Sequence, residues 1–316
     1  MNLIYKIIIA YILDLIFGDP YRIPHPITYI GKLIKKVEKL FYPLENKKFW
    51  GVIFNLIVLS VVYTVSFFIS KIEILEVYFL YTIFASKSLV KESFKVYKAL
   101  SKKNLSEARK QLSYLVSRDT ESLSEKDIIK GTIETCSENI TDGIIAPMLY
   151  MFIGGLPLAM TYKAINTMDS MVGYKTDKYI KFGWFSARLD DWANFIPARF
   201  GGMLFIPLAS LILRYDYKNS LKIYFRDRKN HSSPNSAHTE SSVAGALGIR
   251  LGGSTVYFGK VEEKKYIGNE KKSLEISDIL KTHKIIYFSG AIALICYSLF
   301  WGGINVITWW RYLQNL

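Results

Sequence analysis

Residues 50–70 read WGVIFNLIVLSVVYTVSFFIS, and this uncharged stretch decides the fold class. A helix of about 20 apolar residues crosses a lipid bilayer, so the stretch is long enough to span one. Residues 285–310, IIYFSGAIALICYSLFWGGINVITWW, are also uncharged and end in Trp309 and Trp310. Tryptophan is typical of the lipid–water boundary. We therefore expect an all-α, polytopic integral membrane helical bundle.

The composition agrees with this expectation. The chain has 316 residues, of which 50% are hydrophobic and 15% aromatic, which is too apolar for an ordinary soluble domain. Residues 3–17 and 74–90 are weaker candidate spans because charged residues interrupt or bound them. The amino-terminal run contains Asp14 and lacks a small-residue cleavage site, so it does not predict a cleavable signal.

Two further apolar segments are expected to be irregular. Residues 200–213 are uncharged but too short to span a bilayer. Residues 144–162 are uncharged, but helix-breaking residues interrupt them: Pro147, Gly154, Gly155 and Pro157. Such broken segments are usually re-entrant or shielded by neighbouring helices.

The charge distribution points to membrane topology. A net charge of +14 could suggest nucleic acid, but no recognition motif supports that partner. The basic residues concentrate in the segments 18–49, 87–131 and 214–284, which the positive-inside rule places in the cytoplasm. We expect one membrane-embedded domain over residues 1–316, with a cytoplasmic helical insert at 87–143 and a cytoplasmic loop at 214–284. The distant Cys136 and Cys296 imply neither a disulfide framework nor a thiolate metal site.

The insert carries two capping patterns. Asn104 with Glu107 and Ser124 with Asp127 predict the starts of two helices.

The second of these helices places Glu134 and Glu138 one turn apart. Like charges at that spacing repel unless a cation, a proton or a basic partner lies between them. The alternative for Glu134 is a solvated helix face. Glu138 begins ENITDG, which contains Asp142 and leads into the broken segment, so we favour a functional role there.

The stretch AINTMDSMVGYK places a polar and small stripe on one helix face, formed by Asn166, Asp169, Ser170 and Gly173. The alternative is a helix–helix contact formed by small and polar residues.

The stretch SARLDDWANFIPAR, residues 186–199, gathers two arginines, two acids and an amide: Arg188, Asp190, Asp191, Asn194 and Arg199. Pro197 is expected to end the helix before Arg199. Carboxylate and amide oxygens suit Mg²⁺, and guanidinium groups bind phosphate oxygens in pairs. The alternative is a structural ion pair between Arg188 and Asp191.

Two other motifs carry candidate polar groups. In GDPYRIPHPITYIGK, His25 is either a base or, more commonly for a lone histidine, a structural hydrogen-bonding group. In HSSPNSAHTESSVAGALGIRLGG, residues 231–253, hydroxyls and Asn235 with Glu240 precede a predicted helix. A helix start of this kind is a candidate anion site, although no nucleotide-binding fingerprint accompanies it.

Taken in order, these stretches resemble the adenosylcobinamide-phosphate synthase family of cobalamin biosynthesis, the CbiB/CobD type. The resemblance lies in GDPYRIPHPITYIGK, ETCSENITDGIIAPMLY, KAINTMDSMVGYK with FGWFSARLDDWANFIPARFGG, and SPNSAHTESSVAGALGIRLGGSTVYFGK. The departures, Met168, Ser236 and Ala237, replace no carboxylate. The resemblance implies a multi-pass cell-membrane enzyme that consumes ATP to join the free propionate carboxyl of adenosylcobyric acid to aminopropanol or aminopropanol O-phosphate.

The resemblance supports the positions of the site residues, and side-chain chemistry suggests their roles. ATP and Mg²⁺ are expected, with the corrinoid as substrate. The expected metal ligands are Glu138, Asp142, Asp169, Asp190 and Asp191. The expected substrate or phosphate contacts are Arg188, Arg199, Asn166, Asn194, Ser233 and Asn235. The expected catalytic residues are His25, Glu134, Asp169 and Asp190, with His25 or Glu134 deprotonating the attacking ammonium.

Two alternatives from other classes stay open. A membrane Mg²⁺-dependent phosphotransferase would pack Asp, Gly, Ala and Arg into one short run, whereas Asp142-Gly143 and Ala187-Arg188 are far apart here. A non-enzymatic corrinoid-binding or transport subunit would carry acids in mid-span, whereas these acids cluster near segment ends. Also open are whether the amine arrives phosphorylated and whether the chain acts alone, as a homo-oligomer or with a pathway partner.

A topological expectation follows from the use of ATP. All four motifs must face the cytoplasm, so residues 144–162 are expected to dip into the bilayer and return, or residues 200–213 to compensate.

Overall fold

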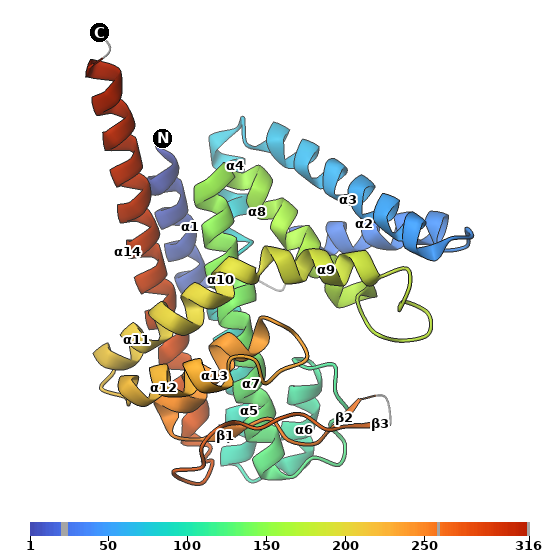
Figure 1. Cartoon of the computed structure of the whole chain (residues 1–316), viewed down its shortest axis with the longest axis vertical. Helices are drawn as coiled ribbons and strands as arrows, with labels where there is room; N and C mark the ends of the chain where they lie inside the picture. The colour runs from blue at the N-terminus through green and yellow to red at the C-terminus, as the bar shows by residue number, and fades with distance from the viewer. Residues whose placement is uncertain (20–24, 258–259, 315–316) are drawn as a thin grey trace. The chain divides into compact units, whose positions relative to one another are not determined.

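The computed structural model describes residues 1–19, 25–257 and 260–314, with side chains omitted for 256–261 and from 304 onward. Residues 20–24 of the proline-rich motif and the side chains of Trp309 and Trp310 therefore lie outside the described parts. The described part of the chain is mainly helical and has almost no sheet (Figure 1), which confirms the all-α prediction. It forms two compact units. The first unit comprises Met1–Phe84, Ala146–Asp190 and Ala291–Leu316, and the second comprises Ala85–Ile145 and Asp191–Gly290.

The first unit is built from apolar helices. They are α1 (Leu3–Phe17), α2 (Pro26–Phe41), α3 (Lys47–Ile69), α4 (Glu73–Tyr81), α8 (Ala146–Val172), most of α9 (Trp184–Ala193) and the carboxyl-terminal part of α14 (Ser277–Gln314). α8 packs on α2 and α3, and α1 packs on α4. α3 is held to the start of α9 by two buried hydrogen bonds between Asn55 and Ser186, of 2.9 and 3.1 Å.

Within the described residues, four helical stretches are long and apolar enough to cross a membrane: Lys47–Ile69, Glu125–Val172, Phe195–Ile212 and Ser277–Gly303. The first and last confirm the two strongest predictions. α3 also exposes large apolar side chains such as Leu56, Val65 and Phe68, which suits a helix surrounded by lipid.

The two predictions of weaker spans, and the prediction that residues 200–213 are too short to span, need correction. Residues 3–17 form α1 with the expected bounds, but at 15 residues it is too short to be among the candidate spans. Residues 74–90 do not form one helix, because α4 ends at Tyr81 and α5 begins at Ser86. Residues 200–213 belong to a longer helical stretch that begins at Phe195 and reaches spanning length.

α8 is kinked, as its sequence predicted. Gly155 adopts φ 61° and ψ −153°, and Gly154 is also non-helical. The conformation of Gly155 is one that only glycine adopts without strain. Pro157 follows inside the helix and has no N–H to donate across the kink. The interruption therefore comes from residues 154–157 rather than from Pro147.

The second unit is also mainly helical. It contains α5 (Ser86–Ser101), α6 (Leu105–Ser113), α7 (Glu125–Ile140), the π-helix η1 (Thr141–Ile145), α10 (Phe195–Phe200), the π-helix η2 (Gly201–Phe205), α11 (Ile206–Ile212), α12 (Tyr217–Asp227), α13 (Ser236–Leu247) and the start of α14. Two short antiparallel pairs join β1 (Arg250–Leu251) to β4 (Ile267–Gly268) and β2 (Thr255–Tyr257) to β3 (Lys260–Glu262). The predicted insert and the predicted loop, 87–143 and 214–284, both fall in this unit.

The predicted helix caps are confirmed. The Asn104 side chain accepts from the backbone N–H of Glu107 at 3.0 Å, at the start of α6. Ser124 accepts from the N–H of Asp127 at 3.2 Å, at the start of α7. Each cap satisfies an N–H that the first turn of a helix leaves without a partner.

Pro197 does not end a helix. The interruption falls at Asn194, and Pro197 lies in the first turn of α10. The first N–H groups of a helix have no partner within the helix, so proline costs little there. The helix instead continues past Arg199 through η2 and α11.

α13 forms the core of the second unit. All 12 of its residues are buried, although its sequence SAHTESSVAGAL is rich in polar groups. It packs on α12, α7 and η2, and α12 lies beside it in Figure 1. A side chain at Gly245 would collide with the carbonyl of Asn219 at 2.6 Å, so glycine is needed for the close approach of α12. Polar groups enclosed in this way need partners.

Candidate functional site

Two glutamates of α7 face the core of the second unit. Glu134 is 8% exposed, and one of its oxygens accepts from Arg118 Nη2 at 2.6 Å. Its other oxygen accepts from the backbone N–H of Gly252 at 2.8 Å. Glu138, one turn later and partly exposed, accepts from the Ser236 hydroxyl at 2.6 Å. The solvated-face alternative for Glu134 is therefore wrong, because its side chain is enclosed and bonded.

Glu240 joins these two residues from α13. It lies inside the helix rather than before it, which corrects the sequence-based placement, and it is only 4% exposed. Burial, followed by the charges of Glu134 and Glu138, raises the pKa of Glu240 well above its ordinary value of 4.5. An isolated carboxylate in this surrounding would lose its hydration, so the protonated form is favoured.

His231 lies near the same glutamates. Burial is the largest influence on the ring and lowers the pKa of His231, against the opposing charges of Glu138 and Glu134. Its Nδ1 accepts from the backbone N–H of Ser233 at 3.0 Å. The ring is therefore neutral near neutral pH and oriented by its own loop.

The start of α13 is occupied by groups of the protein. The Ser233 hydroxyl accepts from the N–H groups of Asn235 and Ser236 at 3.2 and 3.4 Å. The carboxylate of Glu138 takes the hydrogen bond of the Ser236 side chain. The Glu138 carboxylate therefore lies beside the start of α13, where the sequence suggested that an external anion would bind.

A second set of hydrogen-bonded polar residues in the same unit connects Arg199 of α10 to Asn235 in the loop before α13. Asn235 donates to the carbonyl of Asp191 at 2.9 Å and accepts from Arg199 Nη1 at 3.3 Å. Arg199 also donates to the carbonyl of Phe195 at 2.6 Å. Asn194 is 1% exposed at the helix interruption. Four of the predicted contact residues, Asn194, Arg199, Ser233 and Asn235, therefore lie in one region of the second unit.

The first unit holds the other predicted residues. Asn166 of α8 donates from Nδ2 to Asp190 Oδ1 of α9 at 3.3 Å. Asp169 lies one turn after Asn166, near the end of α8, and its carbonyl accepts from the N–H of Gly173 at 2.7 Å. Arg188 lies one turn of α9 from Asp191. The polar stripe on α8 therefore contacts a carboxylate through Asn166. Polar side chains on an apolar helix need a polar partner of this kind.

His25 has a local structural role. It is the N-cap of α2, and its Nδ1 accepts from the N–H of Ile27 at 3.2 Å. Its Nε2 lies 3.4 Å from Asp19 Oδ1. Nδ1 is therefore engaged by the first turn of α2 and Nε2 lies near Asp19, and a catalytic role for His25 stays a prediction.

The predicted metal ligands divide between the units. Asp169 and Asp190 belong to the first, and Glu138, Asp142 and Asp191 to the second. Across the described residues, no group of three His, Cys, Asp or Glu side chains is placed to hold a metal ion. A metal held mainly by substrate phosphates needs only one or two carboxylates.

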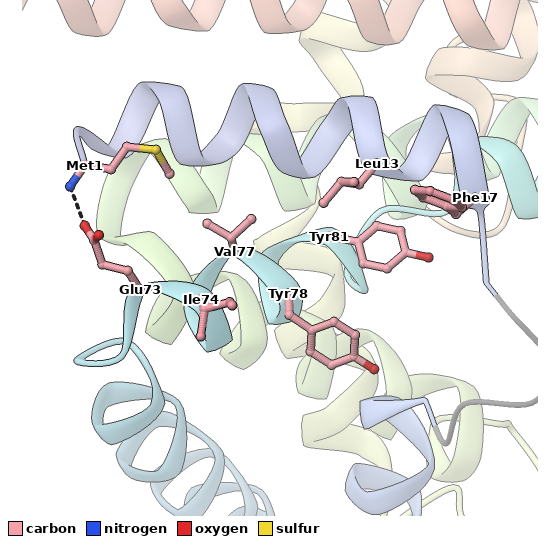
Figure 2. A pocket seen from close by; sticks show the side chains of 8 residues that line it. All are labelled: Met1, Leu13, Phe17, Glu73, Ile74, Val77, Tyr78 and Tyr81. Atoms are coloured by element: carbon pink, nitrogen blue, oxygen red, sulfur yellow. Dashed lines mark hydrogen bonds and ion pairs between the residues drawn. The ribbon is translucent and has the colours of Figure 1, made fainter.

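An apolar pocket of about 620 Å³ lies in the first unit between α1 and α4. Figure 2 shows Leu13, Val77 and Tyr78 along it, with Glu73 at one end beside the terminal amine of Met1. Its lining is mainly hydrocarbon and aromatic, so it lacks the groups needed to manage phosphate or carboxylate charge. This pocket is not the candidate site.

The family profile of the CobD/Cbib protein matches residues 7–286. The chain belongs to the CobD/CbiB family. Relatives named cobalamin biosynthesis protein CobD are 50% identical in Clostridium perfringens, 43% in Leptospira interrogans and 41% in Citrobacter koseri. These alignments cover 89%, 94% and 90% of this chain and 92%, 97% and 93% of the respective relatives. No solved structure matches the chain.

The structure adds residues that sequence reasoning missed. Arg118 lies in the loop before α7 and carries no motif, yet it pairs with Glu134. Glu240 and His231 were visible in the fourth motif, but hydroxyl-rich composition suggested an anion site there. A glutamate in the middle of a segment of small residues was the available signal that this helix is buried together with an ionisable side chain.

Proposed function

We propose that this protein is a cobalamin-biosynthesis enzyme that forms an amide between adenosylcobyric acid and aminopropanol or aminopropanol O-phosphate, with ATP consumed. Membership of the CobD/CbiB family and the names of its relatives support the pathway. The reaction class rests on the resemblance of the four motifs and on the chemistry of their residues.

The geometric observation that carries the proposal is the hydrogen bond of 2.6 Å between Ser236 and Glu138, which are 98 positions apart. It joins the second motif to the fourth around buried glutamates. The phosphotransferase alternative is less well supported, because its Asp142-Gly143 and Ala187-Arg188 elements lie far apart in the sequence instead of in one short run.

The reaction requires activation of the carboxylate. A carboxylate is a poor electrophile, and hydroxide is a poor leaving group, so acid and amine do not condense in water at useful rates. In our proposal ATP phosphorylates the propionate and leaves as ADP. A base, for which Glu134 and His25 are the candidates, takes a proton from the ammonium, and the amine then displaces phosphate. Fixed positive groups stabilise the charge that develops on the transferred phosphoryl group.

The residues divide by chemistry. Asp190 and Asp169, with the amide of Asn166, are our preferred ligands for Mg²⁺, with Glu138, Asp142 and Asp191 as further candidates. When bound with the nucleotide, Mg²⁺ would supply neutralisation of phosphate charge. Arg188 and Arg199 are proposed to contact phosphate oxygens. Asn235 holds the Arg199 guanidinium through its side-chain oxygen at 3.3 Å, which orients it.

The proposed location is the cell membrane, with the motif-bearing loops in the cytoplasm. The four candidate spans support the membrane, and the basic loops support the sidedness. The sidedness is tested by replacing Lys175 with cysteine and treating the protein with a membrane-impermeant thiol reagent. We expect labelling of Lys175→Cys only in inside-out vesicles, and labelling from outside intact cells would contradict it.

The function is tested with purified full-length protein in detergent. Adenosylcobyric acid, Mg-ATP and either aminopropanol or its phosphate are incubated, and the products are separated by mass. We expect adenosylcobinamide or its phosphate, formed only with ATP. Transfer of a nucleotide-derived group to an alcohol would support the phosphotransferase, and corrinoid binding without turnover would support the binding or transport subunit.

A further inference from the structure

The apolar pocket between α1 and α4 lies beside an exposed apolar surface. Four large apolar side chains of α1 are exposed at helical spacing: Tyr5, Ile9, Ile12 and Ile16. The opposite face of α1 is buried. Ile74 of α4, which lines the pocket, is 78% exposed. An unbroken apolar stripe of this kind is typical of a helix in contact with the hydrocarbon chains of a bilayer.

The pocket is elongated along the two helices. On α4 its lining residues Glu73, Val77 and Tyr81 recur one turn apart and share one face. At 1.5 Å per residue this face is about 12 Å long. Figure 2 shows Met1 and Glu73 at one end of the pocket and Phe17 toward the other. The hydrocarbon depth of one bilayer leaflet is about 15 Å, so the lining matches a single acyl chain in length.

Water is a poor occupant of this pocket. The Glu73 carboxylate already accepts from the terminal amine of Met1. The Tyr81 hydroxyl donates to the carbonyl of Gly18. The other described lining residues are hydrocarbon or aromatic, apart from the hydroxyl of Tyr78. A buried water needs about two to four polar partners, whereas a flexible hydrocarbon chain needs none and supplies the dispersion contacts that an unfilled pocket loses.

The charged end of the pocket lies close to the end of a candidate span. Three residues separate the end of α3 from Glu73 at the start of α4. Lys6 binds Glu76 at 2.7 Å and lies 3.3 Å from Glu73. In the connection itself, the exposed Lys71 lies over the Phe67 ring at 4.2 Å. Lysines at the end of a span are typical of the lipid–water boundary, where the phosphate groups of lipids lie.

We propose that this pocket holds one acyl chain of a membrane phospholipid, whose phosphate lies beside Lys71. The hydrocarbon contacts come from Leu13, Val77 and Tyr78, which line the pocket away from its charged end. Lys71 supplies positive charge where the headgroup emerges, outside the apolar lining. The site is built from residues that the proposed reaction does not use, so it stands whether or not that reaction is correct.

Lipid retention tests the pocket. The full chain is expressed in membranes that contain phosphatidylethanolamine and phosphatidylglycerol and purified in a mild detergent, and bound phospholipid is measured by mass spectrometry of the intact protein. We expect one phospholipid per wild-type chain. Val77→Phe, which places a ring inside the pocket, should lower retention about 10-fold or more, a loss of at least about 1.4 kcal/mol. Ile12→Phe, on the exposed stripe of α1, should retain the lipid.

Equal retention in Val77→Phe and Ile12→Phe, or wild-type protein without bound phospholipid, would overturn the proposal. Cross-linking between two copies of the chain at α4, with phospholipid absent, would assign the pocket to a second copy and would also overturn it.

Photolabelling of the wild type keeps the test independent of whether a variant folds. A phospholipid with a diazirine in the middle of one acyl chain is incorporated with the protein into nanodiscs, and labelled peptides are mapped. We expect labelling concentrated around Leu13 and Val77 and reduced by unlabelled phospholipid. Labelling there that is no stronger than at the exposed Leu56 of α3 would contradict a specific site.

The phosphate contact is tested with the same probe. Lys71→Gln is expected to lower the labelling of the pocket several-fold. Lys48→Gln is the matched control, because Lys48 is an exposed lysine at the other end of α3 and lies over the Trp184 ring at 5.6 Å. Equal labelling in the two variants would overturn the placement of the phosphate beside Lys71.

Discussion

The Ser236 hydroxyl donates a hydrogen bond of 2.6 Å to the Glu138 carboxylate and thereby ties the first turn of α13 to α7. A hydrogen bond to a charged acceptor contributes about 1.5–3 kcal/mol. We expect Ser236→Ala to lower the stability of the protein by an amount in this range, measured by unfolding in mixed detergent. Ser241→Ala, which removes only a bond to the backbone of its own helix, is the comparison. Equal losses in the two variants would show that the contact to Glu138 contributes little.

Arg118 neutralises a carboxylate that water hardly reaches. The exposed fractions of the Arg118 and Glu134 side chains are 8% and 10%. Removal of one member of a buried ion pair costs roughly 3–5 kcal/mol, because the other charge is left without a partner. Arg118→Met should therefore destabilise strongly, and the double variant Arg118→Met, Glu134→Gln should recover part of the loss. A double variant that is less stable than Arg118→Met would contradict this explanation.

The kink of α8 depends on Gly155. Its φ of 61° lies in a region where a side chain costs about 1–3 kcal/mol, so Gly155→Ala is expected to destabilise by that amount in thermal unfolding. Gly31→Ala is the control, because an added methyl group there would meet only Met171 Sδ at 3.8 Å within an ordinary helix. We expect this control to be neutral or stabilising.

Glu240 predicts a specific dependence of stability on pH. The folded state raises its pKa above the ordinary value of 4.5. Below that value both states hold the proton and the contribution is fully present. As the pH rises, the unfolded state ionises first, so stability is lost up to the folded-state pKa.

Glu240→Gln removes this titration while keeping the shape of the side chain. The wild type should therefore lose more stability than Glu240→Gln between about pH 5 and pH 8. The neighbouring Glu134, Glu138 and His231 are present in both proteins, so the difference reports on Glu240. Parallel stability curves for the two proteins over this interval would refute the assignment.

Asp190 is expected to be required for turnover and dispensable for folding. It accepts a hydrogen bond from Asn166 at 3.3 Å, and asparagine preserves its size. Asp190→Asn should abolish ligation while the protein still inserts into the membrane and binds corrinoid. Asp191→Asn is expected to behave in the same way. Normal activity in both variants would remove the metal hypothesis for these positions.

Local rules explain what the sequence could predict about the fold. Uncharged stretches located α3 and α14, and side-chain capping located the starts of α6 and α7, because both signals depend on neighbouring residues. The prediction that Pro197 ends a helix was wrong, because proline is tolerated in the first turn of a helix and the sequence did not show that α10 begins just before it. No local pattern in the sequence marked the interruption at Asn194, whose side chain is buried.

The candidate site was predictable in its residues but not in their grouping. Motif order indicated that Glu134, Glu138 and the stretch around Asn235 matter, but only packing shows that Ser236 meets Glu138. The buried position of Glu240 could not be read from its polar neighbours, because serine, threonine and histidine usually lie at a surface. Arg118 carries no pattern in the sequence, and only its approach to Glu134 identifies it.

The central claim is that ATP activates the propionate carboxylate before the amine attacks. It is tested most directly with adenosylcobyric acid labelled with oxygen-18 in its free carboxylate, incubated with the purified protein, Mg-ATP and the amine. The account predicts that one labelled oxygen leaves with inorganic phosphate in each turnover. Label found in AMP, or product formed with no label transferred to phosphate, would contradict it.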